Sequence, residues 1–145
     1  MAQPLVPGDA QSLLEAWKRA WERRDVDAAL ALFREDAEMR TDPFGEPVVG
    51  AMAIRAWWNA LVAGNVHLEL DAERTWVSGR TVLAAWHGAR TDRTNADRIR
   101  IRGFLVLDLD DAGRISRLRG WPLERIVGKD STVRPEPGGP DAEVA

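Results

Sequence analysis

Residues 25–58 have the sequence DVDAALALFREDAEMRTDPFGEPVVGAMAIRAWW, which predicts a helix, a strand end, a loop and a second helix in that order. Asp25 is a typical helix cap. One face of the helix that follows it, VDAALALFRE, carries the apolar residues Val26, Ala29, Leu30 and Phe33. Two prolines and a glycine within residues 37–49 indicate the end of a strand and a structured loop. Gly50 then introduces the second helix, AMAIRAWWNALVA, over residues 51–63.

The flanking segments complete an α+β pattern. Between Ser12 and Arg24 apolar residues recur at spacings of three and four, which predicts one more helix. After Gly64 the apolar spacing changes to two in four segments, residues 67–77, 80–92, 98–110 and 114–124, separated by turn sequences. Helices followed by an antiparallel meander are typical of an α+β fold. We expect the helices to cover one face of a curled sheet and to leave a cone-shaped cavity for a ligand.

Length and composition exclude several classes of protein. The chain has 145 residues and a formal net charge of −3, which fits one folded domain, expected over residues 9–128. Residues 1–8 and 129–145 are rich in proline and glycine and are predicted to be flexible termini. There is no cysteine, so disulfides, thiolate nucleophiles and cysteine-bound metals are excluded.

The chain also lacks the patterns of several partners. No run approaches the roughly 20 apolar residues of a membrane span, and the first residues do not resemble a signal peptide, so we expect a cytoplasmic protein without membrane contact. Residues 74–145 carry 13 basic and 10 acidic residues, too small an excess to predict nucleic-acid binding. Phosphate-binding glycine loops are missing and the two histidines have no metal-ligand spacing, so we predict no cofactor and no metal.

The element order resembles the nuclear transport factor 2-like superfamily, in its SnoaL-like and ketosteroid isomerase-like branch, over about residues 10–127. The features that carry the resemblance are Asp25 opening a helix, the phrase LFREDAEM, the Asp42-Pro43-x-Gly45 loop, and Gly50 followed by AIRAWW. The resemblance implies a cone-shaped α+β barrel, with three N-terminal helices on a curved, mainly antiparallel, cystatin-like sheet. The superfamily holds isomerases, dehydratases, epoxide hydrolases, polyketide cyclases and domains without chemistry, so it leaves the function open.

The resemblance points to two of the three candidate catalytic residues, Asp42 and Arg102. It places Asp42 where ketosteroid isomerases have a carboxylate base, Trp17 at their tyrosine donor and Arg102 at their protonated aspartate. Asp42 is then a general base in a partly buried site, or alternatively the carboxylate of an Asx turn. Arg102 holds an anionic group of the substrate or an enolate oxygen, or alternatively belongs to a solvated row of arginines.

His87 is the third candidate. It lies in the middle of a predicted strand, where it and Trp86 must point to opposite faces of the sheet. The resemblance favours His87 facing the cavity, as a second acid–base group or a partner of Asp42. In that register Val82, Ala84 and Trp86 point away from the helices, and we expect this apolar face to form a homodimer through the sheet.

Aromatic and apolar residues are expected to line the cavity. Trp17 and Trp21 lie on the helix that closes it, and only one of the adjacent Trp57 and Trp58 can face inward. The predicted substrate-binding residues are Trp17, Trp21, Phe44, Trp58, Phe104 and Leu118. We therefore predict a cofactor-independent isomerase, cyclase or epoxide hydrolase that uses Asp42 on an apolar, oxygenated small molecule. The alternative is a ligand-binding or dimerisation module of the same fold without chemistry.

Overall fold

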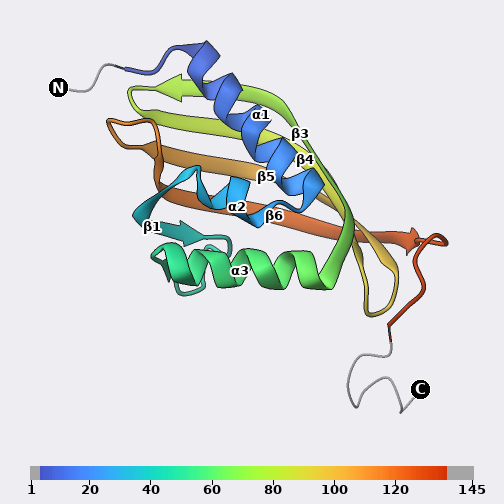
Figure 1. Cartoon of the computed structure of the whole chain (residues 1–145). Helices are drawn as coiled ribbons and strands as arrows, with labels where there is room; N and C mark the ends of the chain where they lie inside the picture. The colour runs from blue at the N-terminus through green and yellow to red at the C-terminus, as the bar shows by residue number, and fades with distance from the viewer. Residues whose placement is uncertain (1–3, 137–145) are drawn as a thin grey trace.

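The computed structural model describes residues 4–136 and places its helices on one face of a six-stranded sheet (Figure 1). Its elements, in chain order, are α1 (Pro7–Arg23), α2 (Val26–Leu30), β1 (Phe33–Arg40), β2 (Val48–Val49), α3 (Ala51–Gly64), β3 (Asn65–Ser78), β4 (Thr81–Asp92), β5 (Asp97–Leu109) and β6 (Ile115–Lys129). The predicted α+β class, with helices on a curved and mainly antiparallel sheet, is confirmed.

The strand order is β2-β1-β6-β5-β4-β3, and the sheet is open rather than closed into a barrel. Strands β3 to β6 form the predicted antiparallel meander. Strand β1 pairs in parallel with β6, with Met39 opposite Leu118. This pairing joins segments about eighty residues apart in the chain, and the local spacing of apolar residues did not reveal it.

The helix predicted over VDAALALFRE is too long. Helix α2 ends at Leu30, and Phe33 begins strand β1. Phe33, Ala37 and Met39 are buried against the neighbouring elements, and this packing overrides the helical spacing of the residues. Helix α1 begins at Pro7, before the expected Ser12, and the Asp9 carboxylate accepts a hydrogen bond from the Val6 backbone N–H (3.4 Å).

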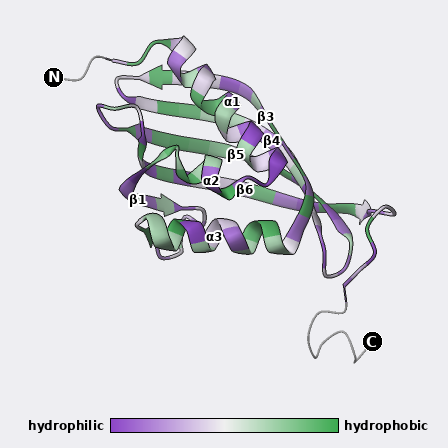
Figure 2. Ribbon diagram, viewed as in Figure 1, coloured by the Kyte–Doolittle hydropathy of each residue, from purple (hydrophilic) through white to green (hydrophobic). Residues whose placement is uncertain are grey.

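An aromatic cluster fills the centre of the helical layer. The Trp58 side chain is fully buried, and its ring lies edge-on to Trp17, Trp21 and Trp57, with centroid distances of 5.4, 5.9 and 5.8 Å. The strands beneath the helices are predominantly apolar (Figure 2). Trp58 therefore belongs to the core and joins α3 to α1.

The sheet face that packs on the helices is the opposite of the predicted one. Val82, Ala84 and Trp86 are buried beneath the helices, with relative exposures of 0%, 0% and 8%, so the prediction that they point outward is wrong. Leu83, Ala85 and His87 alternate with them and lie on the outer face. Both of these alternating sets contain apolar residues. The period of two therefore predicted which residues share a face, but not which face packs on the helices.

Both ends of the described chain are hydrogen bonded to turns of the sheet. The Leu5 N–H donates to Gly79 O (2.8 Å), the Asp130 N–H to Ala96 O (2.8 Å) and the Glu136 N–H to Arg93 O (2.9 Å). The predicted flexible termini include residues 1–3 and 137–145, which lie outside the described residues. Within residues 4–136, no helix has the length and apolar character needed to cross a membrane.

Candidate functional site

A cavity of about 290 Å³ lies between the helices and the inner face of the sheet. This volume is near the lower end for small-molecule sites. Its apolar walls come from both helices and strands: Trp17, Trp21, Met39, Trp57, Leu61, Leu70, Trp86, Ile101, Leu105 and Leu118. Such a surface favours a compact ligand with extended apolar or aromatic area.

Strand β6 leaves this space open because Gly120 occupies an inward-facing position. A Cβ atom placed on Gly120 would meet its first neighbour, Leu105 Cδ2, at 3.5 Å, which is an ordinary van der Waals contact. The position therefore tolerates a side chain, and a longer side chain there would project into the cavity.

Three polar or charged residues line the cavity: Thr41, Arg90 and Glu124. Arg90 Nη2 donates to Glu124 Oε2 at 2.9 Å, and Arg90 Nη1 donates to Asn65 Oδ1 at 2.7 Å. Among residues 4–136, Arg90 and Glu124 are the only charged residues that line the cavity. Glu124 Oε1 has no hydrogen-bond partner within this described part of the chain.

Trp17, Trp21 and Trp86 present ring surface, rather than indole N–H groups, to the cavity. Trp21 Nε1 donates to Glu69 O at 3.2 Å. The Nε1 atoms of Trp17 and Trp86 are buried, with almost no accessible surface. Neither has a hydrogen-bond partner within residues 4–136. Polar recognition of a ligand therefore falls to Thr41, Arg90 and Glu124.

Three of the six predicted binding residues, Trp17, Trp21 and Leu118, line the cavity. Trp58 is buried behind it, while its neighbour Trp57 lines it. Phe44 is 98% exposed in the loop after β1, and Phe104 is 48% exposed on the outer face of the sheet. The predicted placement of Trp58, Phe44 and Phe104 in the cavity wall is therefore wrong.

Asp42 lies in an exposed turn outside the cavity wall. Its carboxylate accepts the Phe44 N–H at 2.9 Å, and its carbonyl accepts the Gly45 N–H at 3.0 Å. These contacts match the Asx turn that was the alternative interpretation. The adjacent Thr41 lines the cavity instead.

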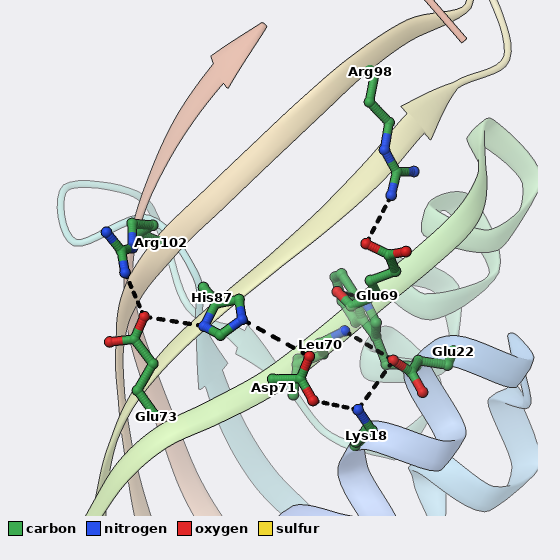
Figure 3. Close-up of polar contacts among 10 residues, drawn as sticks. Lys18, Glu22, Glu69, Leu70, Asp71, Glu73, His87, Arg98 and Arg102 are labelled. Carbon is green, nitrogen blue, oxygen red and sulfur yellow. Dashed lines mark hydrogen bonds and ion pairs between the residues drawn. The ribbon is translucent and has the colours of Figure 1, made fainter. Parts of the chain in front are cut away.

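His87 and Arg102 lie side by side on the outer face (Figure 3). His87 Nδ1 is 3.0 Å from Glu73 Oε1 and its Nε2 is 3.8 Å from Asp71 Oδ2, while Arg102 Nη2 donates to Glu73 at 2.6 Å. The predicted inward orientation of His87 is wrong because Trp86 takes the inward position of the strand. Arg102 has the solvated pairing that was its alternative interpretation.

The same surface network shifts the pKa values of its members. The hydrogen bond from Arg102 lowers the pKa of the Glu73 carboxyl. Lys18 bonds to Asp71 and lies 3.4 Å from Glu22 (Figure 3). The bond between Lys18 and Asp71 lowers the pKa of Asp71 and raises that of Lys18. These shifts stabilise the charged forms of exposed groups, far from the cavity end formed by Arg90 and Glu124.

Residues 14–118 match the model of the SnoaL-like domain family. The chain belongs to the SnoaL-like family. No curated protein gives a significant match. Among solved structures, this SnoaL-like chain is similar to SalBIII, an epoxide hydrolase/cyclase-like enzyme involved in pyran ring formation in the polyether salinomycin. The two chains are 20% identical, with a TM-score of 0.72, and the alignment covers 80% of this chain and 92% of that chain.

Two other solved structures show the same fold. An LEH-like epoxide hydrolase from M. tuberculosis is 21% identical, with a TM-score of 0.67 and coverage of 80% of this chain and 84% of that chain. A computationally designed 17-OHP binder is 20% identical, with a TM-score of 0.70 and coverage of 81% and 98%. At these identities the similarity establishes the fold of the SnoaL-like domain.

Sequence reasoning missed Arg90 and Glu124. Arg90 follows Trp86 by four residues on β4, and Glu124 follows Gly120 by four residues on β6, so each shares the inward period of its strand. Correct placement of Trp86 would have identified both. In residues 4–136 of the SnoaL-like chain, no group of three histidine or acidic residues is arranged to hold a metal ion.

Proposed function

We propose that this SnoaL-like domain binds a compact, largely apolar, oxygen-bearing small molecule, with its polar group at the end of the cavity formed by Arg90 and Glu124. The apolar walls and ring surfaces favour such a ligand. Arg90 offers N–H donors and Glu124 offers an acceptor, and their opposite charges favour a ligand that is neutral overall. The similar fold of a designed 17-OHP binder is consistent with this proposal.

We further propose that Glu124 is the acid–base group of a cofactor-independent enzyme. The observation that carries this proposal is that Arg90 and Glu124, 2.9 Å apart, are the only charged residues lining the cavity among residues 4–136. Oxygen Oε1 of Glu124 is available to take a proton from water or from a substrate carbon. The Arg90 guanidinium can stabilise negative charge that develops on a substrate oxygen. A carboxylate base beside a cation is suited to isomerisation, to cyclisation and to epoxide hydrolysis.

The test is Glu124→Gln, which preserves the size of the side chain and removes its basicity. We expect turnover in trans-stilbene oxide hydrolysis or 5-androstene-3,17-dione isomerisation to fall by about a hundredfold or more. Binding of the neutral dye Nile red should change less than about twofold. Asp42→Asn is the matched control and should retain turnover. Loss of turnover in Asp42→Asn alone would restore Asp42 as the base, and binding without turnover in the wild type would support the non-catalytic alternative.

We also propose a homodimer through the outer face of the sheet, with a surface different from the one predicted from the sequence. Trp76, Phe104, Trp121 and Leu123 are exposed there, and Phe104 pairs directly with Trp121 across the strands. Beside this apolar surface, acidic residues of β3 pair with arginines of β5, Glu73 with Arg102 and Glu69 with Arg98, so these charges are already matched within one copy. A two-fold axis through the apolar surface would bury it against the same surface of a second copy. A monomer in sedimentation at micromolar concentration would contradict this proposal.

A further inference from the structure

Three polar side chains form a row across one end of the cavity. Asn65 begins β3, Arg90 is near the end of β4, and Glu124 is on β6. The intervening strand β5 contributes only isoleucines to this part of the inner face, with Ile99 opposite Arg90 and Ile101 opposite Glu124. Arg90 therefore spans the width of β5 to reach Glu124, and Asn65 contacts it from the other side.

The Asn65 carboxamide can satisfy both of its neighbours in one orientation only. Its Nδ2 donates to Leu61 O at 3.0 Å, and its Oδ1 accepts from Arg90 Nη1 at 2.7 Å. A flipped amide would set its NH₂ against the guanidinium N–H and its oxygen against the carbonyl oxygen. Asn65 is 8% exposed, so loss of both bonds would leave buried polar groups without partners. The side chain is thus fixed by Leu61, which itself lines the cavity from α3.

Glu124 receives no comparable support from elsewhere. Its side chain is 45% exposed, and Arg90 is its only ion-pair partner among residues 4–136. A partly exposed pair of long side chains costs conformational entropy to hold in one geometry and contributes little net stability. The Arg90 side chain is 20% exposed, and Asn65 holds one of its nitrogens in place. A second nitrogen is thereby directed at Glu124.

We infer that Asn65 is a positioning residue: it fixes the Arg90 guanidinium across the cavity end, and Arg90 in turn fixes the Glu124 carboxylate for acid–base chemistry. This inference rests on the proposed function. It assigns Asn65 no contact with the substrate. Its effect passes through Arg90, and because Asn65 also bonds to Leu61, it connects the cavity wall formed by α3 with the polar end.

The experiment compares Asn65→Ala with wild type by ¹⁵N–¹H NMR of the arginine guanidinium groups. In wild type we expect separate, slowly exchanging Nη–H signals for Arg90, assigned by their loss in Arg90→Lys. In Asn65→Ala these signals should merge as the guanidinium rotates. For trans-stilbene oxide, kcat should fall by about tenfold to a hundredfold, with KM and the affinity for Nile red within about twofold. Asn59→Ala, an exposed asparagine of α3, is the matched control and should leave every readout unchanged.

A second variant, Asn65→Asp, keeps an acceptor for Arg90 but cannot donate to Leu61 O. Its Arg90 signals should stay separate, while kcat should fall because the new carboxylate competes with Glu124 for Arg90. The inference is overturned if Asn65→Ala retains the wild-type Arg90 signals, or if both variants retain the wild-type kcat. Should Asn65→Ala fail to fold, merged Arg90 signals in Asn65→Asp, which keeps the acceptor for Arg90, overturn it instead. A wild type without turnover contradicts the proposed function, whereas the Arg90 signals still test the positioning.

Discussion

The two faces of the sheet differ in what their charged residues do. The inner face is covered by helices, and its cavity contains one charged pair, Arg90 with Glu124. The outer face carries a network of hydrogen bonds and ion pairs that includes Asp71, His87 and Arg102 (Figure 3). Because alternate residues of the same strands supply both faces, a shift of one position exchanges the candidate catalytic residues for residues of a surface network.

The charges on the two faces also differ in their surroundings. The side chains of Arg102 and Glu73 are 68% and 39% exposed, so water screens their attraction and the pair contributes little to the stability of the fold. Arg90 is 20% exposed and lies beside apolar walls, where a charge interacts more strongly with a bound ligand. The sequence singled out His87 because it lies in the middle of a strand, yet Arg90 and Glu124 are the charged residues that line the cavity among residues 4–136.

The largest expected effect comes from placing an arginine at each of two adjacent alanines, one on the inner and one on the outer face of the sheet. Ala84 is fully buried, so Ala84→Arg places a charge in the core without a partner and should destabilise the fold by about 3 kcal/mol or more. Ala85→Arg points to the outer face beside Phe104 and should leave the Tm within a few degrees of wild type. It should instead dissociate the proposed homodimer. Thermal unfolding by circular dichroism and sedimentation velocity measure the two effects.

The comparison of faces would fail if both arginine variants melted at similar temperatures. A dimer that persisted in Ala85→Arg would remove the outer apolar surface from the proposed interface. Only the first result would show that strand β4 is not oriented as its burial pattern indicates.

Local sequence patterns predicted most elements of the fold but not how distant segments meet. The four long strands follow from a period of two, and the stripe of α1 follows from spacings of three and four. The parallel pairing of β1 with β6 depends on burial of Phe33 and Met39 against a distant strand. The sequence around Phe33 and Met39 has no local feature that predicts this pairing, so the start of β1 was assigned to a helix.

The site was predicted less well because its residues depend on a choice between two faces. Trp17, Trp21 and Leu118 were assigned to the cavity and lie in its wall. The predictions for His87, Arg102 and Phe104 relied on their side of the sheet facing inward, and Trp86 occupies the inward side instead. Those for Asp42 and Phe44 relied on the loop after β1, where both residues are exposed. Period-two spacing cannot orient a strand when Val82 and Leu83 are both suitable for burial. The orientation of the strand is decided by three-dimensional packing, because the helices cover the face that carries the larger set of apolar residues.

A smaller effect is expected from filling the cavity. Gly120→Leu should place a side chain in the ligand space without displacing backbone atoms, since the first contact of a Cβ there is at 3.5 Å. We expect affinity for Nile red to fall by about tenfold or more, with little change in Tm. Arg117→Leu, on an exposed outward position of the same strand, is the control and should bind as wild type. Equal loss of binding in both variants would place the dye on the outer surface.

The smallest expected effect concerns the bond between Lys18 and Asp71 in the outer network. The pKa of Asp71 is lowered from 3.8, so its contribution to stability is present above about pH 4 and is lost as the pH falls through its folded value. The pKa of Lys18 is raised from 10.5, so its contribution is present below that pH and is lost as the pH rises through its folded value. The bond should therefore stabilise the fold between these limits.

Asp71→Asn removes the bond, and because the Asp71 side chain is 55% exposed, we expect a decrease in Tm of only about 1–2 °C at pH 7. The difference from wild type should shrink below pH 4, where the wild-type carboxylate becomes protonated, and also in 1 M NaCl, where the attraction is screened. Asp111→Asn, in an exposed turn, controls for the general change in net charge. A difference that grew on acidification would mean that Asp71 is not stabilised as a carboxylate. The network on the outer face would then lack the charge pairing that distinguishes it from the cavity side.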